Sequence, residues 1–459
     1  MEYQVAVLGG GPGGYVAAIK AAQLGMKVCV IEKGKLGGTC LNVGCIPTKA
    51  LLASAEIYDT LVSSGSDHGI TVDNVTLDVS AMVKRKDDVV KRLVGGIGYL
   101  FKKNGVTLIE GKGTLISSKE IKVETEKDIQ YITTDNIIIA TGSTPLLPKI
   151  FGYDGNIVCS SDEALSWDEL PEKLVIIGGG VIGCEFATLY SNLGCKVTVV
   201  ELLPSLLANL DEDLAKTVTS SLKKKGVNIY TGISVQTIDK QANGAIVNLS
   251  NGETVEADKV LVSIGRNPVI DNIGLEYLGL NMDRRKIAVN NRMQTNLPNI
   301  YAIGDVCNSP LDLAHTASRE GIVAVENIAG MDSSMDYSAI PNCVFTHPEL
   351  STVGLTAKEA QDRGINVKTS VFKFTALGKA LAMGQPEGFI KLVVDTSNDQ
   401  LIGAQMAGPH VTDIIAEAAL LVHNKGTIDQ LVATVHAHPT LAEAVWEAAE
   451  GVYGKAIHS

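Results

Sequence analysis

The sequence has few of the features that mark membrane, nucleic-acid-binding or secreted proteins. Its formal net charge at pH 7 is −12, and no basic stripe interleaved with aromatic residues occurs, which argues against a nucleic-acid or anionic-membrane surface. No apolar run reaches the length of about 18–20 residues that a bilayer span needs. Met1-Glu2-Tyr3 leads directly into a predicted strand, without a charged leader or a cleavage-site pattern, so we expect a cytoplasmic protein.

Cysteines are few and do not form the regular framework of a secreted disulfide-rich domain. The chain has 8 cysteines among 459 residues, at irregular spacing. In a reducing compartment, a paired-cysteine motif is more typical of catalysis than of structure. Six of the eight are predicted to be buried as small apolar side chains: Cys29, Cys159, Cys184, Cys195, Cys307 and Cys343.

The other two, Cys40 and Cys45, lie in the glycine-rich segment Gly37–Lys49. A disulfide needs Cα atoms about 4.4–6.8 Å apart, which residues five apart in an ideal helix do not reach. The chain must therefore turn between the two cysteines, and Asn42 and Gly44 are residue types that tolerate such a turn.

Several functions remain open for this pair. Pro47 suits a first helical turn, which would place Cys45 at free backbone N–H groups and favour its thiolate. A structural disulfide is an alternative. A zinc site is disfavoured because no second Cys/Cys or Cys/His pair at ligand spacing accompanies the first.

A dinucleotide-binding pattern precedes the cysteine pair. Residues 3–8 form a predicted strand, G-x-G-x-x-G follows at Gly9, Gly11 and Gly14, and a later strand ends on Glu32. Such glycines allow a tight turn and close approach to a pyrophosphate, while the acid can accept a hydrogen bond from a ribose hydroxyl.

The whole pattern occurs a second time. Gly9 and Gly178 are separated by 169 residues, as are Glu32 and Glu201. The second copy consists of the strand 174–177, the glycines Gly178, Gly180 and Gly183, and the terminal acid Glu201. Two generic α/β packing turns would leave this glycine spacing unexplained, so we expect two dinucleotide sites.

The chemistry of the pair suggests which dinucleotides these are. A redox disulfide exchanges an electron pair, a nicotinamide accepts a hydride, and a flavin can mediate between them. We therefore assign the first site to FAD and the second to NAD. No Arg or Lys occurs in the several residues after Glu201, which disfavours the 2′-phosphate of NADP.

Later segments are predicted to complete these sites. A buried strand, 136–140, leads into Thr141-Gly142-Ser143, and the strand 259–264 leads into Gly265 in the same way. Asp305 follows another apolar strand, where a ribityl or ribose contact competes with a plain surface position.

The chain changes in composition from Asn342 onward and has no further phosphate loop. It carries His436 and His438 ahead of Glu443. Two histidines without a third ligand argue against a metal site. Either histidine could be a structural hydrogen-bonding group, but the pattern favours a His base oriented by a nearby carboxylate.

These motifs together resemble the dihydrolipoamide dehydrogenases, a family of flavin-dependent pyridine nucleotide–disulfide oxidoreductases of class I. The resemblance covers essentially the whole chain and includes Gly304-Asp305 and Thr346-His347-Pro348-Glu349. It implies an α/β fold with two Rossmann-like dinucleotide-binding domains plus a C-terminal α+β dimerisation domain. The implied divisions are an FAD-binding domain at 1–146, an NAD-binding domain at 147–266, a central domain at 267–340 and an interface domain at 341–459.

The resemblance also implies a role for each site residue. Cys40 would be the thiol that meets the substrate and Cys45 the one that contacts the flavin. His438 and Glu443 from one subunit of a homodimer would complete the active site of the other. Lys49 and Glu185 would form an ion pair beside the flavin ring. The remaining residues implied at the cofactor sites are Gly113, Thr141, Gly142, Gly265, Asp305 and Ala314.

The implied reaction is oxidation of protein-bound dihydrolipoamide to lipoamide with reduction of NAD⁺. The lipoyl group would arrive on a lipoyl-bearing acyltransferase or on a glycine cleavage carrier protein.

Three parts of the sequence depart from the commonest family pattern: Thr48, the segment 266–269 and the segment 315–318. A glutathione-type reductase would need basic residues after Glu201, and a mercuric reductase would need thiols near the C-terminus. A non-catalytic flavoprotein scaffold is the alternative from another class, disfavoured by the intact cysteine and histidine motifs.

Overall fold

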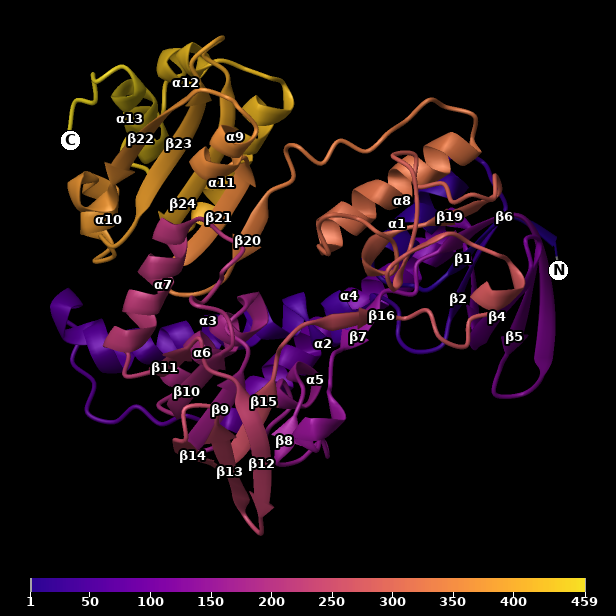
Figure 1. The fold of residues 1–459 in the computed structure, drawn as a ribbon, viewed down its shortest axis with the longest axis horizontal. Coiled ribbons are helices and arrows are strands. Elements are labelled where there is room, and N and C mark those ends of the chain that lie inside the picture. The colour runs from indigo at the N-terminus through magenta and orange to yellow at the C-terminus, as the bar shows by residue number, and fades with distance from the viewer. Residues whose placement is uncertain (1, 459) are drawn as a thin grey trace.

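Two sheets with parallel strands carry the two glycine-rich turns in the computed structural model, which describes residues 2–458 (Figure 1). The first sheet has seven strands. Four of them run parallel, in the order β3 (Thr107–Glu110), β2 (Val28–Glu32), β1 (Glu2–Leu8) and β6 (Ile129–Ile139). Next to β6, the sheet continues with the antiparallel strands β5 (Glu120–Glu124) and β4 (Lys112–Ser117), and β19 (Ile300–Ala302) also pairs with β6, in parallel. The central strands are buried on both faces, as expected for a parallel sheet between helices.

The second sheet repeats the βαβ unit of the first. Its parallel strands are β11 (Asn228–Thr231), β10 (Lys196–Glu201), β9 (Lys173–Ile177), β15 (Lys259–Val262) and β8 (Val158–Cys159). An antiparallel sheet of β12 (Val235–Gln241), β13 (Gly244–Leu249) and β14 (Thr254–Ala257) lies beside it, and the helices of this lobe are α5 (Ser161–Ala164), α6 (Val181–Asn192) and α7 (Glu212–Lys224). Helix α6 matches α1 (Pro12–Gln23) in length and in its distance from the turn.

The C-terminal lobe is an antiparallel sheet with helices packed against it, which confirms the expected α+β class. The strand order is β20 (Asn342–Val344), β21 (Glu349–Gly354), β24 (Leu401–Gly408), β23 (Phe389–Asp395) and β22 (Val367–Lys373). Its helices are α9 (Ala357–Asp362), α10 (Gly378–Ala382), α11 (Val411–His423), α12 (Ile428–Ala433) and α13 (Glu443–Val452). Helix α11 contacts β21 and β24, whereas α13 contacts β22 and β23.

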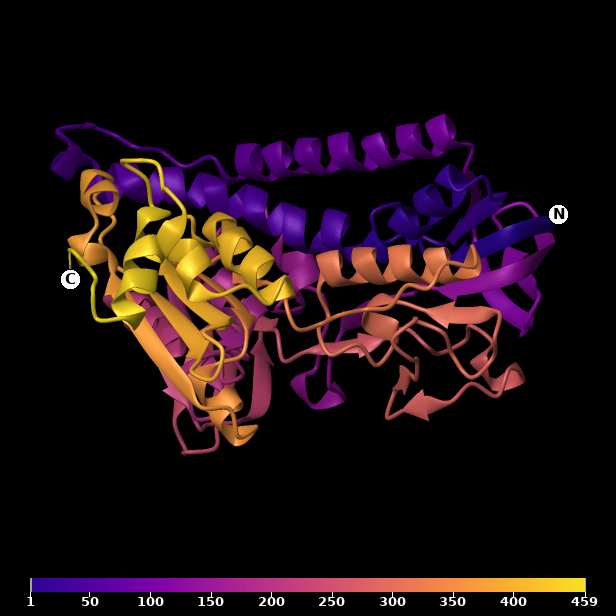
Figure 2. The same ribbon diagram turned by 90° about the horizontal axis from the view of Figure 1, so that it is seen from above.

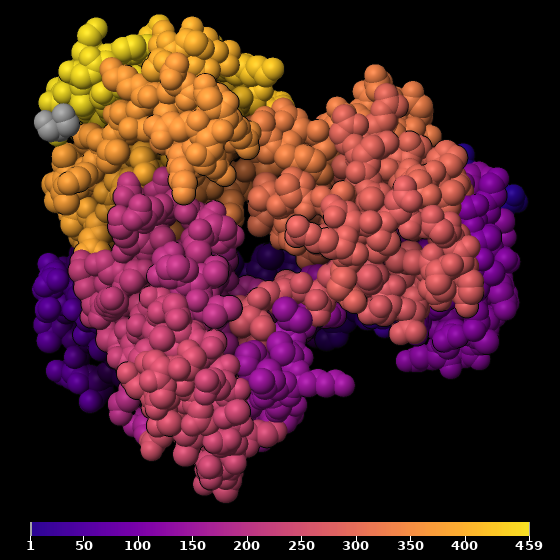
Figure 3. All heavy atoms as spheres, in the orientation of Figure 1, coloured from indigo at the N-terminus to yellow at the C-terminus, as the bar shows by residue number. Residues whose placement is uncertain are grey.

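The longest helices join the lobes. Helices α3 (Cys45–Asp59) and α4 (Val79–Asn104) run along one face of the molecule, next to the short helix α2 (Gly38–Val43), and α8 (Ala314–Ile328) lies against α1 (Figure 2). The short strands are β7 (Ser143–Pro145), β16 (Arg266–Pro268), β17 (Met282–Asp283) and β18 (Lys286–Ile287), of which β7 pairs with β16 where the two nucleotide-binding lobes meet. Figure 3 shows a recess between the three lobes, with atoms of the N-terminal part of the chain at its base. In the range 2–458 no helix combines the length and apolar character needed to cross a membrane.

Candidate active site

The cysteine pair spans the junction of two consecutive helices. Cys40 lies in α2, and Cys45 is the first residue of α3. Gly44 separates them with φ −142° and ψ −116°, which breaks the helix. A Cβ at Gly44 would lie 3.0 Å from Thr39 O and 3.4 Å from Cys40 Cα. Glycine therefore lets α3 begin directly beside the backbone of Cys40.

Two expectations for this region need correction. Asn42, expected to help the turn, lies inside α2, where its side-chain amide donates hydrogen bonds to Leu36 O at 3.0 Å and Gly38 O at 2.9 Å. The amide holds α2 against the preceding loop, and Gly44 alone breaks the helix. Cys343, expected to be buried, is only half-buried.

The two thiols differ strongly in acidity. Both are free, with Cys40 half-buried and Cys45 exposed. The pKa of Cys45 is lowered to about 7, chiefly because Cys40 donates a hydrogen bond to it, and the charge of Lys49 assists the shift. Although Cys45 is exposed, the surrounding protein displaces part of the water that would hydrate the thiolate, which opposes the shift. The pKa of Cys40 is raised because its thiol donates that bond and is itself buried. In the reduced pair these shifts favour the thiolate at Cys45 and the thiol at Cys40.

Lys49 lies one helical turn after Cys45 and pairs with Glu185 of α6. Lys49 Nζ is 2.9 Å from Glu185 Oε1 and 2.8 Å from Oε2, and the Glu185 side chain is only 6% exposed. The C-terminal lobe holds both partners through Phe345. Its backbone N–H donates to Glu185 Oε1 at 3.0 Å, and its ring centroid lies 4.4 Å from Lys49 Nζ, within cation–π range. Three lobes therefore meet at this ion pair.

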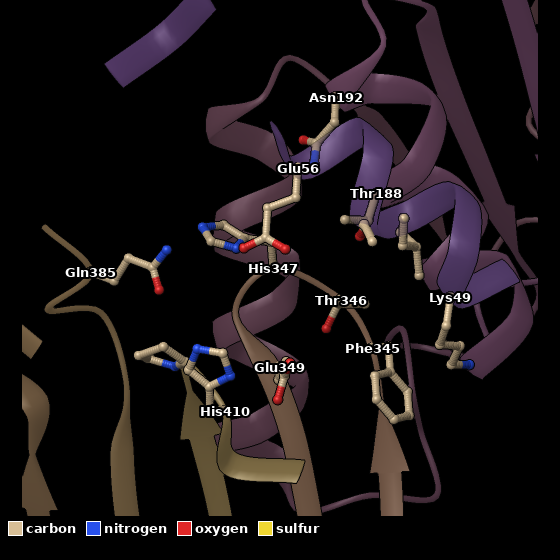
Figure 4. A pocket seen from close by; sticks show the side chains of 13 residues that line it. Lys49, Glu56, Thr188, Asn192, Phe345, Thr346, His347, Glu349, Gln385 and His410 are labelled. Carbon is tan, nitrogen blue, oxygen red and sulfur yellow. The ribbon is translucent and has the colours of Figure 1, made fainter. Parts of the chain in front are cut away.

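A cavity of about 250 Å³ adjoins the ion pair (Figure 4). Lys49 and Phe345 form part of its wall, α3 and α6 contribute further residues, and the connection around β20 and β21 closes it from the C-terminal lobe. Figure 4 shows the side chains of His347, His410 and Gln385 at the edge of this space. The cavity thus lies on the side of Lys49 where the C-terminal lobe packs against α3.

The two glycine-rich turns have the same geometry. Gly9 and Gly178 have φ values of +110° and +106°, a region that favours glycine. A Cβ at Gly14 would lie 1.9 Å from Gly9 O, and a Cβ at Gly183 would lie 1.9 Å from Gly178 O. Only glycine permits helices α1 and α6 to start this close to the preceding strand, as a dinucleotide turn requires.

The acids at the strand ends also occupy equivalent positions. Glu32 Oε2 accepts from Gly10 N–H at 2.6 Å and Oε1 from Gly34 N–H at 2.7 Å. Glu201 accepts in the same way from Gly179 N–H at 2.5 Å and Leu203 N–H at 2.7 Å. Each carboxylate is thereby fixed at the edge of its turn, with lone pairs left over for ribose hydroxyls.

The residues present fit two dinucleotides. Helices α1 and α6 have glycine N-caps, Gly11 and Gly180, with no side-chain cap and no acid in the first turn. By contrast, the side chains of Asp78 and Asp211 cap α4 and α7. The first N–H groups of α1 and α6 are therefore free to bind pyrophosphate, which a capping carboxylate would repel.

Asp305 lies where the first nucleotide-binding lobe meets the second. Ser143 Oγ donates to Asp305 Oδ2 at 2.5 Å and accepts from Arg266 Nε at 2.7 Å. Arg266 also reaches Thr39 Oγ1 at 3.3 Å, directly beside Cys40. The sequence placed Arg266 at the exit of the second nucleotide-binding unit and in a segment that departs from the family pattern, but it did not predict this link. The available signal was the position of Arg266 directly after Gly265 at the exit of the second unit, which matches the position of Ser143 directly after Gly142 at the exit of the first.

The structure also places the other residues that were expected at the cofactor sites. Thr141 donates its hydroxyl to Val269 O at 2.7 Å, Gly142 and Gly265 have positive φ, Gly113 is buried in β4, and Ala314 is the first residue of α8. Among residues 2–458, four buried side-chain oxygens have no hydrogen-bond partner: Asn42 Oδ1 in α2, Thr316 Oγ1 and Asn327 Oδ1 in α8, and Gln405 Oε1 in β24. Of these, Asn42 lies two residues from Cys40 and Thr316 two residues from Ala314, so these two fit a ligand bound at the first site.

His438 and Glu443, which the sequence predicts to be a base and its orienting carboxylate, form a hydrogen-bonded pair. His438 Nδ1 is 2.8 Å from Glu443 Oε1, and Thr440 N–H donates to Glu443 Oε2 at 2.8 Å. Burial raises the pKa of Glu443, but these two hydrogen bonds outweigh it and leave the pKa lowered. The carboxylate therefore stays charged and fixes the ring, whose Nε2 edge is free in an imidazole that is 79% exposed.

His436 has a different environment. Its Nδ1 lies 3.0 Å from Thr434 O and its Nε2 2.8 Å from Glu417 Oε1, so both ring nitrogens face acceptors within the lobe. This is a structural role. Over the part of the chain that the structure describes, no cluster of three or more His, Cys, Asp or Glu side chains could hold a metal ion.

The cysteines and His438 are not brought together within one chain. Helices α2 and α3, which carry the two cysteines, contact each other and α4, and α3 also contacts α6. Helix α13, which begins at Glu443, instead contacts α12, β22 and β23. In Figure 1, α13 lies near the far end of the C-terminal lobe. The exposed His438 in one lobe and the exposed Cys45 in another can therefore meet only across two copies of the chain or after a large movement.

Fold and site together define a disulfide oxidoreductase with two dinucleotide sites. A family model described as "Pyridine nucleotide-disulphide oxidoreductase" matches residues 3–321, and the dimerisation domain of the same family matches residues 340–449. A dihydrolipoyl dehydrogenase of Geobacillus stearothermophilus is 44% identical over 100% of this chain and 98% of that protein. Dihydrolipoyl dehydrogenase 1, mitochondrial, of Arabidopsis thaliana is 41% identical over 100% of this chain and 92% of that protein.

Solved structures agree with this assignment. LpdA from Mycobacterium tuberculosis superimposes with a TM-score of 0.92 at 27% identity, covering 98% of this chain and 99% of that one. The HOCl-induced flavoprotein disulfide reductase RclA from Escherichia coli gives 0.87 at 26% identity, covering 98% and 99%. The chain belongs to the dihydrolipoyl dehydrogenase family of pyridine nucleotide-disulphide oxidoreductases. Its cofactors are accordingly FAD and NAD.

Proposed function

We propose that the chain oxidises protein-bound dihydrolipoamide to lipoamide and reduces NAD⁺, using Cys40 and Cys45 as its redox disulfide. The observation that carries the proposal is the geometry around the cysteine pair. Helix α3 begins at Cys45 directly beside the backbone of Cys40, and Lys49, one helical turn further on, is held by Glu185. The lowered pKa of Cys45 supports a thiolate at this position as the product of disulfide reduction.

The protein's own groups account for the thiol chemistry. His438, held by Glu443, takes a proton from one substrate thiol, and the resulting thiolate attacks Cys40 Sγ. The Cys40–Cys45 bond breaks, and Cys45 leaves with the electron pair as a thiolate. The second substrate thiol then attacks the mixed disulfide, and its proton passes to Cys40 as lipoamide is released.

The cofactors connect this pair to the second site. Gly9, Gly11, Gly14, Glu32, Asp305 and the N-terminus of α8 would hold FAD, and Gly178, Gly180, Gly183 and Glu201 would hold NAD. Bound FAD supplies the transfer of the electron pair from the reduced cysteines to NAD⁺. The role of the protein is to keep Cys45 ionised, to position both dinucleotides and to bring a base to the substrate.

The proposal extends to the assembly. His438 and Glu443 of one copy would serve the Cys40–Cys45 pair of another, which agrees with the exposure of the histidine in a single chain. The domains would divide at 146, 266 and 340, and the substrate would be a lipoyl group carried by an acyltransferase or by a glycine cleavage protein.

The test is NAD⁺-dependent oxidation of dihydrolipoamide by the FAD-loaded protein, followed as NADH formation. We expect turnover with NAD⁺, and no NADH- or NADPH-dependent reduction of glutathione disulfide in the control. Efficient glutathione reductase activity without dihydrolipoamide oxidation would overturn the proposal.

A further inference from the structure

Glu320 in α8 is a fully buried carboxylate without a cationic partner. Its exposed fraction is 0%, and across residues 2–458 no lysine, arginine or histidine forms an ion pair with it. Burying an unpaired charge is costly unless hydrogen bonds compensate for it. Two donors do so. Gly304 N–H donates to Oε2 at 2.6 Å and Tyr337 O–H donates to Oε1 at 2.8 Å.

The first of these donors belongs to the turn that carries Asp305. Gly304 has φ +70° and opens the short helical turn Gly304–Val306. Its N–H is held by Glu320, and its carbonyl oxygen accepts from Cys307 Sγ at 3.2 Å. Since the backbone of Gly304 is fixed on both sides, the direction of the neighbouring Asp305 side chain toward Ser143 is fixed as well.

The same turn of α8 also touches the first glycine-rich turn. A Cβ at Gly13 would lie 3.0 Å from Ala317 O, and a Cβ at Gly321 would lie 2.7 Å from Gly13 O. Figure 1 shows α8 beside α1, as the contacts between them require. One helical turn of α8 therefore sets the distance between the phosphate-binding helix and the Asp305 turn.

We propose that Glu320 is a positioning residue that holds the Gly304–Asp305 turn in the conformation that binds the ribityl chain of FAD. The inference rests on the proposed flavin site. A carboxylate accepts both hydrogen bonds at once, whereas a leucine at this position, close to glutamate in volume, offers an acceptor to neither Gly304 N–H nor Tyr337 O–H. A leucine would therefore leave Gly304 N–H buried without its acceptor.

Flavin affinity is the direct readout, measured by adding FAD to the apoprotein and following flavin fluorescence. Glu320→Leu should raise the dissociation constant about tenfold or more, because the buried Gly304 N–H loses its acceptor. Tyr337→Phe removes one neutral donor and should raise it less, about threefold. Glu326→Leu is the matched control. It lies on the same helix in a surface ion pair with Lys20 and should leave FAD affinity unchanged.

A double-mutant cycle separates positioning from a general structural role. If Glu320 acts through the Asp305 turn, Glu320→Leu should add little to the loss caused by Asp305→Asn. Fully additive losses, or unchanged affinity in Glu320→Leu, would overturn the inference. Should Glu320→Leu not fold, Tyr337→Phe in the same cycle decides in the same way. Because this readout is FAD affinity and the test of the proposed function is NADH formation, either can fail alone.

Discussion

At Cys45, the hydrogen bond from the neighbouring Cys40 thiol decides whether the pKa is raised or lowered. Burial and the charge of Glu185 favour the neutral thiol, whereas the hydrogen bond from Cys40 and the charge of Lys49 favour the thiolate. The sequence predicted a helix that starts beside Cys45, which α3 confirms, and assigned the acidity to that helix start. The largest cause of the lowered pKa is instead the hydrogen bond from Cys40. The contribution of Cys40 could not be foreseen, because it depends on how Gly44 turns α3 back beside α2.

The lowered pKa of Cys45 predicts a pH dependence in the reduced protein. Since the folded pKa is about 7, the thiolate dominates above that pH and is lost as the pH falls through it. The ultraviolet thiolate absorbance of the reduced protein should therefore rise with a midpoint near pH 7, and Cys45→Ser should lack this transition. A midpoint near that of a free cysteine would contradict the hydrogen-bonded pair.

His438 offers a second prediction at this scale. Loss of a general base typically slows turnover by about 10²–10⁴-fold. His438→Gln should therefore fold, retain FAD and lose dihydrolipoamide turnover to that extent, in an NADH assay. His436→Gln is a control for the neighbouring imidazole, whose nitrogens are both engaged within the lobe. Normal turnover in His438→Gln would remove it from the chemistry.

The duplicated βαβ unit was predictable at the scale of elements. The 169-residue offset read from Gly9 and Gly178 reappears in the bounds of α1 and α6 and in the contacts of Glu32 and Glu201. The Lys49–Glu185 contact was expected from the family resemblance, and α8 was missed. The apolar residues of α8 pack onto α1, which is distant in the sequence. The hydrogen-bond donors that compensate for the burial of Glu320 likewise come together only in the folded chain.

The second unit makes a prediction about cofactor choice. Glu201 presents a carboxylate at the end of β10, followed by the exposed side chains of Leu202 and Leu203. A 2′-phosphate would meet this negative charge without a cation to offset it. The wild-type protein should strongly prefer NAD⁺ to NADP⁺, and Glu201→Arg should narrow the ratio of their kcat/KM values. Equal use of both by the wild type would contradict the assignment.

At the scale of the whole molecule, the separation of His438 from the cysteines predicts complementation between subunits. Homodimers of Cys45→Ser and of His438→Gln should each be nearly inactive. A mixed dimer has one site with both native groups, so coexpression should restore dihydrolipoamide turnover in the purified heterodimer. Absence of restored activity, with heterodimer present, would show that both groups act within one chain.

The central claim is that the chain stores an electron pair on Cys40 and Cys45 in addition to that held by its flavin. An anaerobic reductive titration of the FAD-loaded protein, followed by flavin absorbance, measures this directly. We predict that the wild-type protein takes up one electron pair more per chain than Cys45→Ser does. Equal uptake by the two proteins would contradict the account.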